Sequence, residues 1–233
     1  MKLAALFSGG KDSTYSIYKA TQLGHDVKCL ITLFPKSPNS HLLHFPNIKL
    51  TNLQSETMNI PHIVMEPETA ETDQEMKVLG ILLKKAKQDF QIDGLLHGGI
   101  SSEFQKKRFE NVCKENDLNI LTPLWNTNPK KYMNEIINSG FKFILTSVSS
   151  DGLDETLLGK IITAPDLSKL SELSEKYGFN LNFEGGEAET FVVDCPLYSH
   201  PIRITKSKKI WDGYRGTLEI NGAGLDYSVK QNN

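Results

Sequence analysis

The sequence has few cysteines and no long apolar run. Only three cysteines, Cys29, Cys113 and Cys195, occur among 233 residues, and no two form a CxxC pair. That scarcity argues against a disulfide scaffold and a zinc ribbon, and it leaves the roles of the three thiols open. No segment approaches the roughly 18 consecutive apolar residues that a membrane-spanning helix needs, so we expect no membrane association.

An excess of charge of one sign is also absent. Lys plus Arg total 26 and Asp plus Glu total 28, which gives a formal net charge of −2. This near balance argues against a protein whose whole surface binds nucleic acid, and we expect no stable nucleic-acid binding. The apolar run Leu3–Phe7 is too short for a signal peptide, so we expect a cytoplasmic protein.

Strand and helix patterns alternate over the first half of the chain. Short apolar runs predict strands, and amphipathic stretches between them predict helices. The predicted strands are residues 3–7, 27–34, 62–65, 94–97 and 120–123, and the predicted helices are residues 11–23, 72–90 and 102–116. Alternation of this kind predicts a parallel sheet with helices on both faces.

The pattern changes after Trp125. A helix over residues 129–138, a strand over 141–148, a helix over 166–177 and alternating strands to the end predict a smaller α+β domain. We therefore expect one domain over residues 1–125 and a second over residues 126–233. Residues 36–55 are polar and rich in Pro, Asn, Ser and His, so they are expected to form a loop that covers bound ligands as a lid.

The string Ser8-Gly9-Gly10-Lys11-Asp12-Ser13 follows the first predicted strand and opens the first predicted helix. Two glycines permit a tight turn close to a ligand, and a helix N-terminus attracts anions. The two hydroxyls add donors, Lys11 adds a positive charge, and Asp12 is a magnesium ligand. The string therefore predicts a phosphate-binding loop, although its spacing is neither GxxxxGK[ST] nor GxGxxG. The alternative is a glycine turn in which Asp12 or Ser13 caps the helix.

A second string places three glutamates around a glycine pair, before an apolar strand. It reads Glu184-Gly185-Gly186-Glu187-Ala188-Glu189-Thr190. Like charges so close together repel one another, so a cation, a metal or a positively charged substrate is expected nearby. The alternative is a plain glycine turn with solvated glutamates.

Together the two strings resemble the diphthine–ammonia ligase family, which is part of the PP-loop (N-type ATP pyrophosphatase) superfamily. The resemblance extends over almost all of residues 1–200. Further matching segments are residues 24–27, 43–47, 98–113, 123–125 and 152–159. Ala188 departs from the family pattern, which usually has an aromatic residue there, and Gly99 stands where alanine is common.

The resemblance implies a fold and a reaction. The fold would be an α/β domain of the adenine nucleotide alpha-hydrolase type, with five parallel strands in the order 3-2-1-4-5, and the second domain would bind the substrate. The reaction would be the amidation of diphthine, a modified histidine of translation elongation factor 2, with ATP and ammonium. Its products would be diphthamide, AMP and pyrophosphate, and Mg²⁺ would accompany ATP. Since no glutaminase domain fits in the remaining length, free ammonium is the expected nitrogen source.

The resemblance also implies roles for individual residues. The residues expected to bind ATP are Ser8, Gly9, Gly10, Lys11, Asp12, Ser13, Gly98 and Gly99, with Asp12 as the metal ligand. The expected catalytic residues are Lys11, Asp12, Arg108 and Glu187. The expected substrate-binding residues are Gln105, Glu184, Gly185, Gly186, Glu187, Glu189 and Thr190, with the rings of Phe183 and Phe191 beside the trimethylammonium group of diphthine.

Helical spacing bears on two of these residues independently. Gln105 and Arg108 share one face of the predicted helix with Ser101 and Val112, and the polar end of that face lies where ligands bind in a parallel α/β sheet. Arg108 as an ordinary surface cation is the alternative. We also expect the two strings to face each other across one cleft, with Gly186 within a nucleotide's length of Gly10.

Other interpretations stay open at this level. The chain could be another PP-loop adenylating enzyme that acts on tRNA, such as a thiolase or a lysidine-type ligase, or a non-enzymatic nucleotide-binding module. A thiolase would usually carry a CxxC pair, and the second string has no use in a simple binding module. Cys195 is expected to be a buried thiol. A homo-oligomer is compatible with the sequence.

Overall fold

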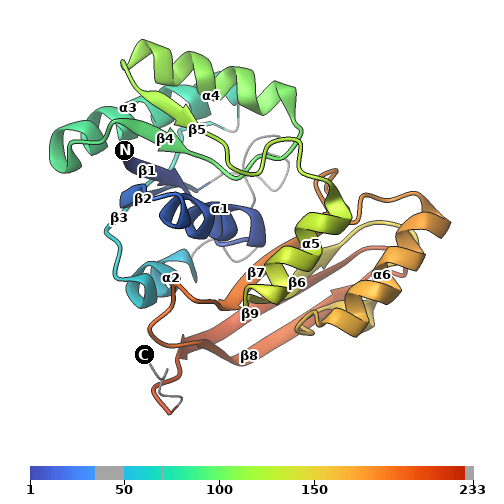
Figure 1. The fold of residues 1–233 in the computed structure, drawn as a ribbon. Coiled ribbons are helices and arrows are strands. Elements are labelled where there is room, and N and C mark those ends of the chain that lie inside the picture. The colour runs from blue at the N-terminus through green and yellow to red at the C-terminus, as the bar shows by residue number, and fades with distance from the viewer. Residues whose placement is uncertain (35–49, 70, 229–233) are drawn as a thin grey trace. The chain divides into compact units, whose positions relative to one another are not determined.

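The computed structural model describes residues 1–34, 50–69 and 71–228. The chain divides into two compact units, Met1–Asn126 and Thr127–Asn233. Figure 1 shows the elements of both units, and each unit is described by itself below.

The first unit contains a five-stranded parallel sheet. Its strands are β1 (Lys2–Leu6), β2 (Asp26–Leu33), β3 (His62–Met65), β4 (Gly94–Leu96) and β5 (Asn119–Leu121). They lie in the order β3-β2-β1-β4-β5, and every neighbouring pair is parallel. The predicted sheet and its predicted strand order are thereby confirmed.

Helices cover both faces of this sheet. Helices α1 (Lys11–Gln22) and α2 (Thr51–Met58) lie on one face, and α3 (Thr72–Phe90) and α4 (Glu103–Glu115) lie on the other (Figure 1). The core beneath α3 and α4 includes Leu79 and Phe109, which are at most 3% exposed. In α3 the buried leucines recur at helical spacing, which is why the sequence predicted this helix at its observed bounds.

Helix α2 corrects one expectation. The segment 36–55 was expected to be a loop, but Thr51–Met58 is helical. The buried face of this helix carries three polar side chains, Thr51, Gln54 and Thr57, each at most 1% exposed, beside Met58. A hydrophobic period could not reveal a helix whose buried face is polar. Residues 36–49 lie outside the described residues, so the lid stays a prediction.

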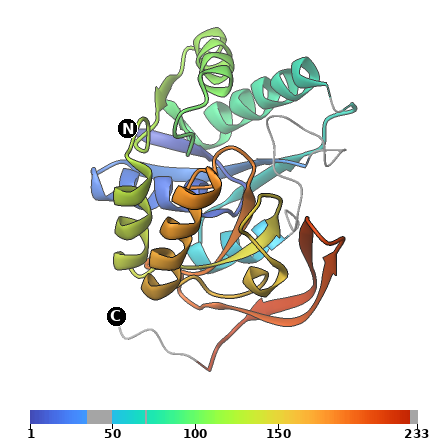
Figure 2. The same ribbon diagram turned by 90° about the vertical axis from the view of Figure 1, so that its right-hand side faces the viewer.

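The second unit contains a four-stranded antiparallel sheet. Its strands are β6 (Lys142–Val148), β7 (Ala188–Asp194), β8 (Ile202–Trp211) and β9 (Gly216–Leu225), in the order β7-β6-β9-β8. Helices α5 (Pro129–Asn138) and α6 (Ala164–Tyr177) lie side by side against one face of this sheet (Figures 1 and 2). A 3₁₀ turn, η2, spans Glu155–Leu157. The architecture of this unit is that of the smaller α+β domain that the sequence predicts.

No helix within the described ranges is both long and apolar enough to cross a membrane.

Candidate active site

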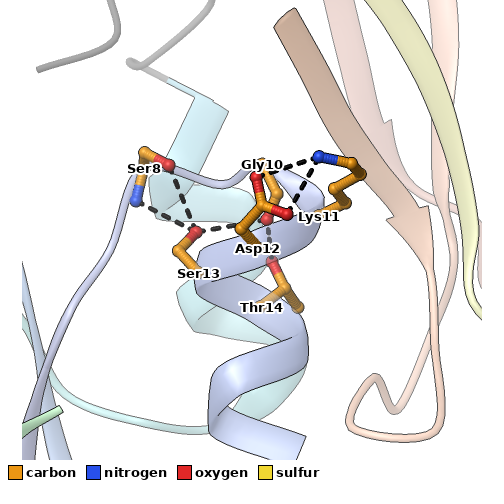
Figure 3. Close-up of polar contacts among 6 residues, drawn as sticks. All are labelled: Ser8, Gly10, Lys11, Asp12, Ser13 and Thr14. Atoms are coloured by element: carbon orange, nitrogen blue, oxygen red, sulfur yellow. Dashed lines mark hydrogen bonds and ion pairs between the residues drawn. The ribbon is translucent and has the colours of Figure 1, made fainter. Parts of the chain in front are cut away.

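The string Ser8–Ser13 forms a turn between β1 and α1. Gly10 is the N-cap of α1 and no side chain caps the helix, so the alternative in which Asp12 or Ser13 caps it is wrong. The hydroxyl of Ser13 accepts from the Ser8 amide at 3.3 Å and donates to the Gly10 carbonyl at 3.1 Å (Figure 3). The turn therefore leaves the N-terminal end of a 12-residue helix without a capping side chain, the geometry that attracts an anion.

Lys11 and Asp12 form an ion pair at the start of α1. The Lys11 ammonium lies 2.9 Å from both carboxylate oxygens of Asp12 (Figure 3). Lys11 is 1% exposed, whereas the Asp12 side chain is 35% exposed. A buried cation beside an accessible carboxylate can contribute positive charge to phosphate and an oxygen ligand to a metal ion.

Gly9 can only be a glycine for two separate reasons. Its φ is +78°, a left-handed conformation that other residues adopt at a cost. A Cβ there would lie 2.2 Å from Oε1 of Gln54, whose Nε2 donates to the Gly9 carbonyl at 2.9 Å. Gln54 is fully buried in α2, so this missed helix holds the Ser8–Ser13 turn directly.

The end of β1 is also held by side chains from β2 and β3. The Thr32 hydroxyl donates to the Phe7 carbonyl at 2.6 Å, and Nε2 of His62 lies 2.7 Å from that hydroxyl. Since the hydroxyl proton is used on Phe7, Nε2 of His62 must be the donor to Thr32. Burial lowers the pKa of His62 to about 4, which keeps this imidazole neutral at pH 7.

The glycine pair after β4 packs against the start of α1. A Cβ on Gly98 would lie 2.6 Å from the carbonyl carbon and oxygen of Asp12 and 2.8 Å from the Ser13 nitrogen. Gly98 thus allows backbone to contact backbone at the start of α1. The structure therefore brings Gly98 to the Ser8–Ser13 turn, although 85 positions separate Gly98 from Ser13 in the sequence.

His97 fixes the second glycine of this pair. Its Nδ1 accepts from the Gly99 amide at 3.0 Å, so the ring proton is on Nε2. His97 is 2% exposed, and its ring meets the ring of Phe109 edge-on with 5.0 Å between centroids. Burial and, secondarily, the charge of Lys106 lower the pKa of His97 to about 4. Within the described residues its buried Nε2 has no hydrogen-bond partner.

Gln105 and Arg108 lie on α4, which begins at Glu103 with Ser102 as its N-cap. Ser101, expected on the same helical face, precedes the helix. Oε1 of Gln105 lies 3.9 Å from the position of a Cβ on Gly99, so Gln105 is close to the glycine pair. The guanidinium of Arg108 instead lies over the Phe104 ring, 3.8 Å from its centroid.

The second string forms a turn that leads into β7. Gly186 has a φ of +85°, and its carbonyl accepts from the Ser149 hydroxyl at 2.7 Å. The Glu187 carbonyl accepts from the Ser149 amide at 2.8 Å. Glu189 and Thr190 lie in β7, where they pair with Ser147 and Leu145 of β6. The turn is therefore anchored to the end of β6.

Glu187 stabilises this turn with its side chain. Oε1 accepts from both the backbone amide and the side-chain amide of Asn180, at 2.9 and 2.8 Å. Its other carboxylate oxygen, Oε2, is buried without a hydrogen-bond partner among the described residues. Glu184 is half-buried, and Gly185 and Gly186 are exposed.

The expected aromatic faces are not available to a ligand. Phe183 is 5% exposed and Phe191 is 3% exposed, so both rings are core residues. Phe183 stacks on Phe179 with 6.3 Å between ring centroids, and its φ is +62°. The expectation that these rings contact a trimethylammonium group is wrong, because Phe183 stacks on Phe179 in the core and Phe191 is buried in β7.

All three cysteines are buried. Burial raises the pKa of Cys29 and of Cys113 to about 12, and it raises the pKa of Cys195 further. Each thiol is therefore protonated at neutral pH and is a poor nucleophile. Cys195 is the buried thiol that the sequence predicted.

The described residues include no group of three or more His, Cys, Asp or Glu side chains that could hold a metal ion. Mg²⁺ bound with ATP commonly uses only one or two carboxylates together with the phosphates. Asp12, accessible at the start of α1, fits that requirement.

Three residues that support the Ser8–Ser13 turn were missed as site residues, because each is a single polar residue with no motif around it: Gln54, Thr32 and His62. That Gly10 and Gly186 share one cleft concerns the arrangement of the two units and stays a prediction.

Both parts of the chain match known protein families. Residues 1–120 match the diphthamide synthase N-terminal domain, and residues 128–225 match the diphthamide synthase C-terminal domain. A diphthine–ammonia ligase from Danio rerio is 34% identical over 228 residues, which cover 90% of this chain and 89% of the relative. The human diphthine–ammonia ligase is 33% identical over 228 residues, with 90% and 85% covered.

A solved structure described as a predicted subunit of tRNA methyltransferase from Methanocaldococcus jannaschii is also similar in part. Its TM-score is 0.43 at 17% identity, covering 84% of this chain and 98% of that one. The two domain matches and the identity to relatives of similar length establish membership, and the chain belongs to the diphthine–ammonia ligase family.

Proposed function

We propose that the chain amidates diphthine on translation elongation factor 2, with ATP and ammonium as the other substrates. The products are diphthamide, AMP and pyrophosphate. Family membership supports this reaction, and the cytoplasm, where elongation factor 2 works, is its proposed location. One observation carries the ATP-binding part: the Ser8–Ser13 turn opens α1 without a side-chain cap and packs backbone to backbone against Gly98.

The chemistry explains why ATP is needed. A carboxylate resists attack by ammonia because its leaving group would be an oxide. Attack of the diphthine carboxylate on the α-phosphorus of ATP forms a mixed anhydride and releases pyrophosphate. Ammonia then attacks the acyl carbon, and AMP leaves. Free ammonium is the proposed nitrogen source.

The first unit supplies the nucleotide-binding groups in this proposal. The amides at the start of α1, with Ser8, Gly9, Gly10 and Ser13, bind the phosphates, and Gly98 and Gly99 line the nucleotide site. Lys11 exchanges its ion pair with Asp12 for the phosphate oxygens, which frees the Asp12 carboxylate. Asp12 would hold Mg²⁺ together with the phosphates, and the ion would neutralise charge on the leaving pyrophosphate.

Gln105 and Arg108 complete the nucleotide side of the proposal. Gln105 lies beside Gly99 and offers an amide to the nucleotide or the adenylate. Arg108 offers positive charge to the reacting phosphoryl group after leaving the Phe104 ring.

The second unit supplies the substrate-binding groups. Diphthine carries a permanent positive charge on its trimethylammonium group, which carboxylates attract. Glu184, Glu187 and Glu189 provide negative charge, and Gly185, Gly186 and Thr190 allow the substrate to approach the backbone. Glu187 has a second task, since its Oε1 already holds Asn180.

Pyrophosphate release tests the proposal. Purified protein is incubated with ATP, ammonium and diphthine-bearing elongation factor 2, and in a parallel reaction with tRNA in place of the factor. We expect release with the factor alone, and no release from Asp12→Ala at limiting magnesium. Release with tRNA and none with the factor would favour a tRNA-modifying enzyme, and ATP binding without release would favour a binding module.

A further inference from the structure

The second unit contains a pocket to which the proposed reaction assigns no role. Its volume is about 410 Å³. One wall is the loop from Gly152 to Lys160, and the other is a single face of α6. Along α6 the lining residues follow the spacing i, i+3, i+4, i+7 and i+11, so they share one face of the helix. They are Asp166, Lys169, Leu170, Leu173 and Tyr177.

The base of the pocket is apolar and its entrance is open. Leu153 and Leu170 are 4% and 1% exposed, whereas Tyr177 at the other end is 45% exposed. Gly152 has a φ of +85°, and a Cβ there would lie 2.4 Å from the Tyr177 ring. Only glycine permits this approach of the loop to the ring, so the loop and α6 come closest at this point.

The charged side chains that line the pocket differ in how many hydrogen bonds and ion pairs they already make. Asp154 accepts from the Thr156 amide at 2.9 Å and from the Thr156 hydroxyl. Asp166 pairs with Lys160 and accepts from the amide and the hydroxyl of Thr163. Lys169 is exposed and has no hydrogen bond or ion pair with any residue in the described part of the chain, although its charge helps to lower the pKa of Asp154. The pocket therefore presents an apolar base and one cation that can take a new partner.

The pocket is linked to the Glu184–Thr190 turn within the same unit. Three residues after Tyr177, Asn180 donates twice to Oε1 of Glu187. Three residues before Gly152, the Ser149 hydroxyl donates to the Gly186 carbonyl at 2.7 Å. Both walls of the pocket thus continue into the turn that is proposed to bind diphthine.

We propose that this pocket binds a segment of the protein substrate beside the modified histidine. The segment would place an apolar side chain against Leu153 and Leu170 and an acidic side chain on Lys169. A polyanion such as ATP or RNA is disfavoured, since Asp154 and Asp166 line the same pocket. A peptide segment satisfies both the apolar base and the single available cation. This inference depends on the proposed function, because it extends the same substrate site.

Charge reversal at Lys169 tests the pocket. We expect Lys169→Glu to raise the KM for diphthine-bearing elongation factor 2 about tenfold, because an attractive pair becomes a repulsive one. Neither kcat nor the KM for ATP should change. Lys169→Met keeps the aliphatic stem and removes the charge, so it should raise the KM by an intermediate factor.

Lys130→Glu is the matched control. Lys130 is an exposed lysine on the neighbouring helix α5, and its ammonium makes no ion pair with a described residue. This variant changes the net charge equally and should leave the KM unchanged. Equal KM values for Lys169→Glu, Lys169→Met and the unaltered protein would overturn the proposal that this pocket binds the substrate segment. Failure of the unaltered protein to release pyrophosphate would instead overturn the proposed function, so the two failures are distinguishable.

Discussion

The two glycine turns of this protein are held in different ways. In the first unit, Gly98 lets the backbone after β4 contact the backbone at the start of α1. A side chain at Gly9 would collide with the buried side chain of Gln54. In the second unit, the turn before β7 has open space around Gly186, and the Glu187 carboxylate holds it through Asn180. The first turn thus depends on close backbone approach, whereas the second turn uses a carboxylate for its own support.

The comparison predicts that an added methyl group is most damaging at Gly98. In Gly98→Ala the Cβ would meet the backbone of Asp12 at 2.6 Å, and backbone cannot rotate away. Displacement of the phosphate-binding loop should lower kcat/KM at least about a hundredfold. Steady-state kinetics of AMP formation measure this. Gly224→Ala is the control, because a Cβ at Gly224 in β9 meets no atom within 4 Å. Equal rates for both variants would break the comparison.

Gly9→Ala should act through stability as well as activity. The left-handed conformation of Gly9 and the contact with Oε1 of Gln54 should together lower the free energy of unfolding by about 2 kcal/mol. Because Gln54 is a side chain, Gln54→Ala should relieve part of this loss. A double-mutant cycle by urea denaturation measures the coupling. Strictly additive effects would show that Gln54 does not restrict Gly9.

His97 is one of the side chains that support the first unit, and it should make stability depend on pH. Its folded-state pKa is about 4, below the ordinary value of 6.5, so the unfolded chain binds more protons between these values. Stability should therefore fall as the pH falls from about 6.5 towards 4. The contribution of His97 is at most about 1.4 kcal/mol per pH unit, or roughly 1.5 kcal/mol between pH 6.5 and 5.

His97→Asn isolates this contribution. The asparagine carbonyl can accept from the Gly99 amide in place of Nδ1, and it does not titrate. Urea unfolding at pH 7, 6 and 5 should show a flatter decline for the variant. His62 titrates in both proteins and cancels from the difference. Parallel pH profiles would mean that His97 has an ordinary pKa in the folded protein.

Two substitutions of Glu187 can distinguish the effect of its charge from its structural role in the second unit. Glu187→Gln retains a carbonyl acceptor for Asn180 and removes the charge, so the fold should persist while the KM for the protein substrate rises about tenfold. Glu187→Ala removes the acceptor too, and it should lower the unfolding free energy by about 1 kcal/mol. Thermal unfolding and kinetics distinguish the two effects. An unchanged KM in Glu187→Gln would leave Glu187 with a structural role alone.

Much of the fold followed from local patterns. The strand at 62–65 and the helices at 72–90 and 129–138 have their predicted bounds, since each has an apolar period or an apolar run between clear stops. The strand order 3-2-1-4-5 came instead from the family resemblance. Helix α2 was missed because its buried face is polar, and the rings of Phe183 and Phe191 were misplaced because composition does not tell which side chains a turn or a strand buries.

By itself, the sequence determined the parallel sheet, the glycine turn after its first strand and the glutamate-rich turn far along the chain. These depend on residues adjacent in sequence, whose φ preferences, charges and periodicity act locally. Only the tertiary structure decided that Gln54 holds Gly9, that Gly98 packs on Asp12, that Glu187 holds Asn180 and that Lys169 lines a pocket. Such contacts are set by how elements pack, and a single polar residue carries no sign in the sequence of the partner it will meet.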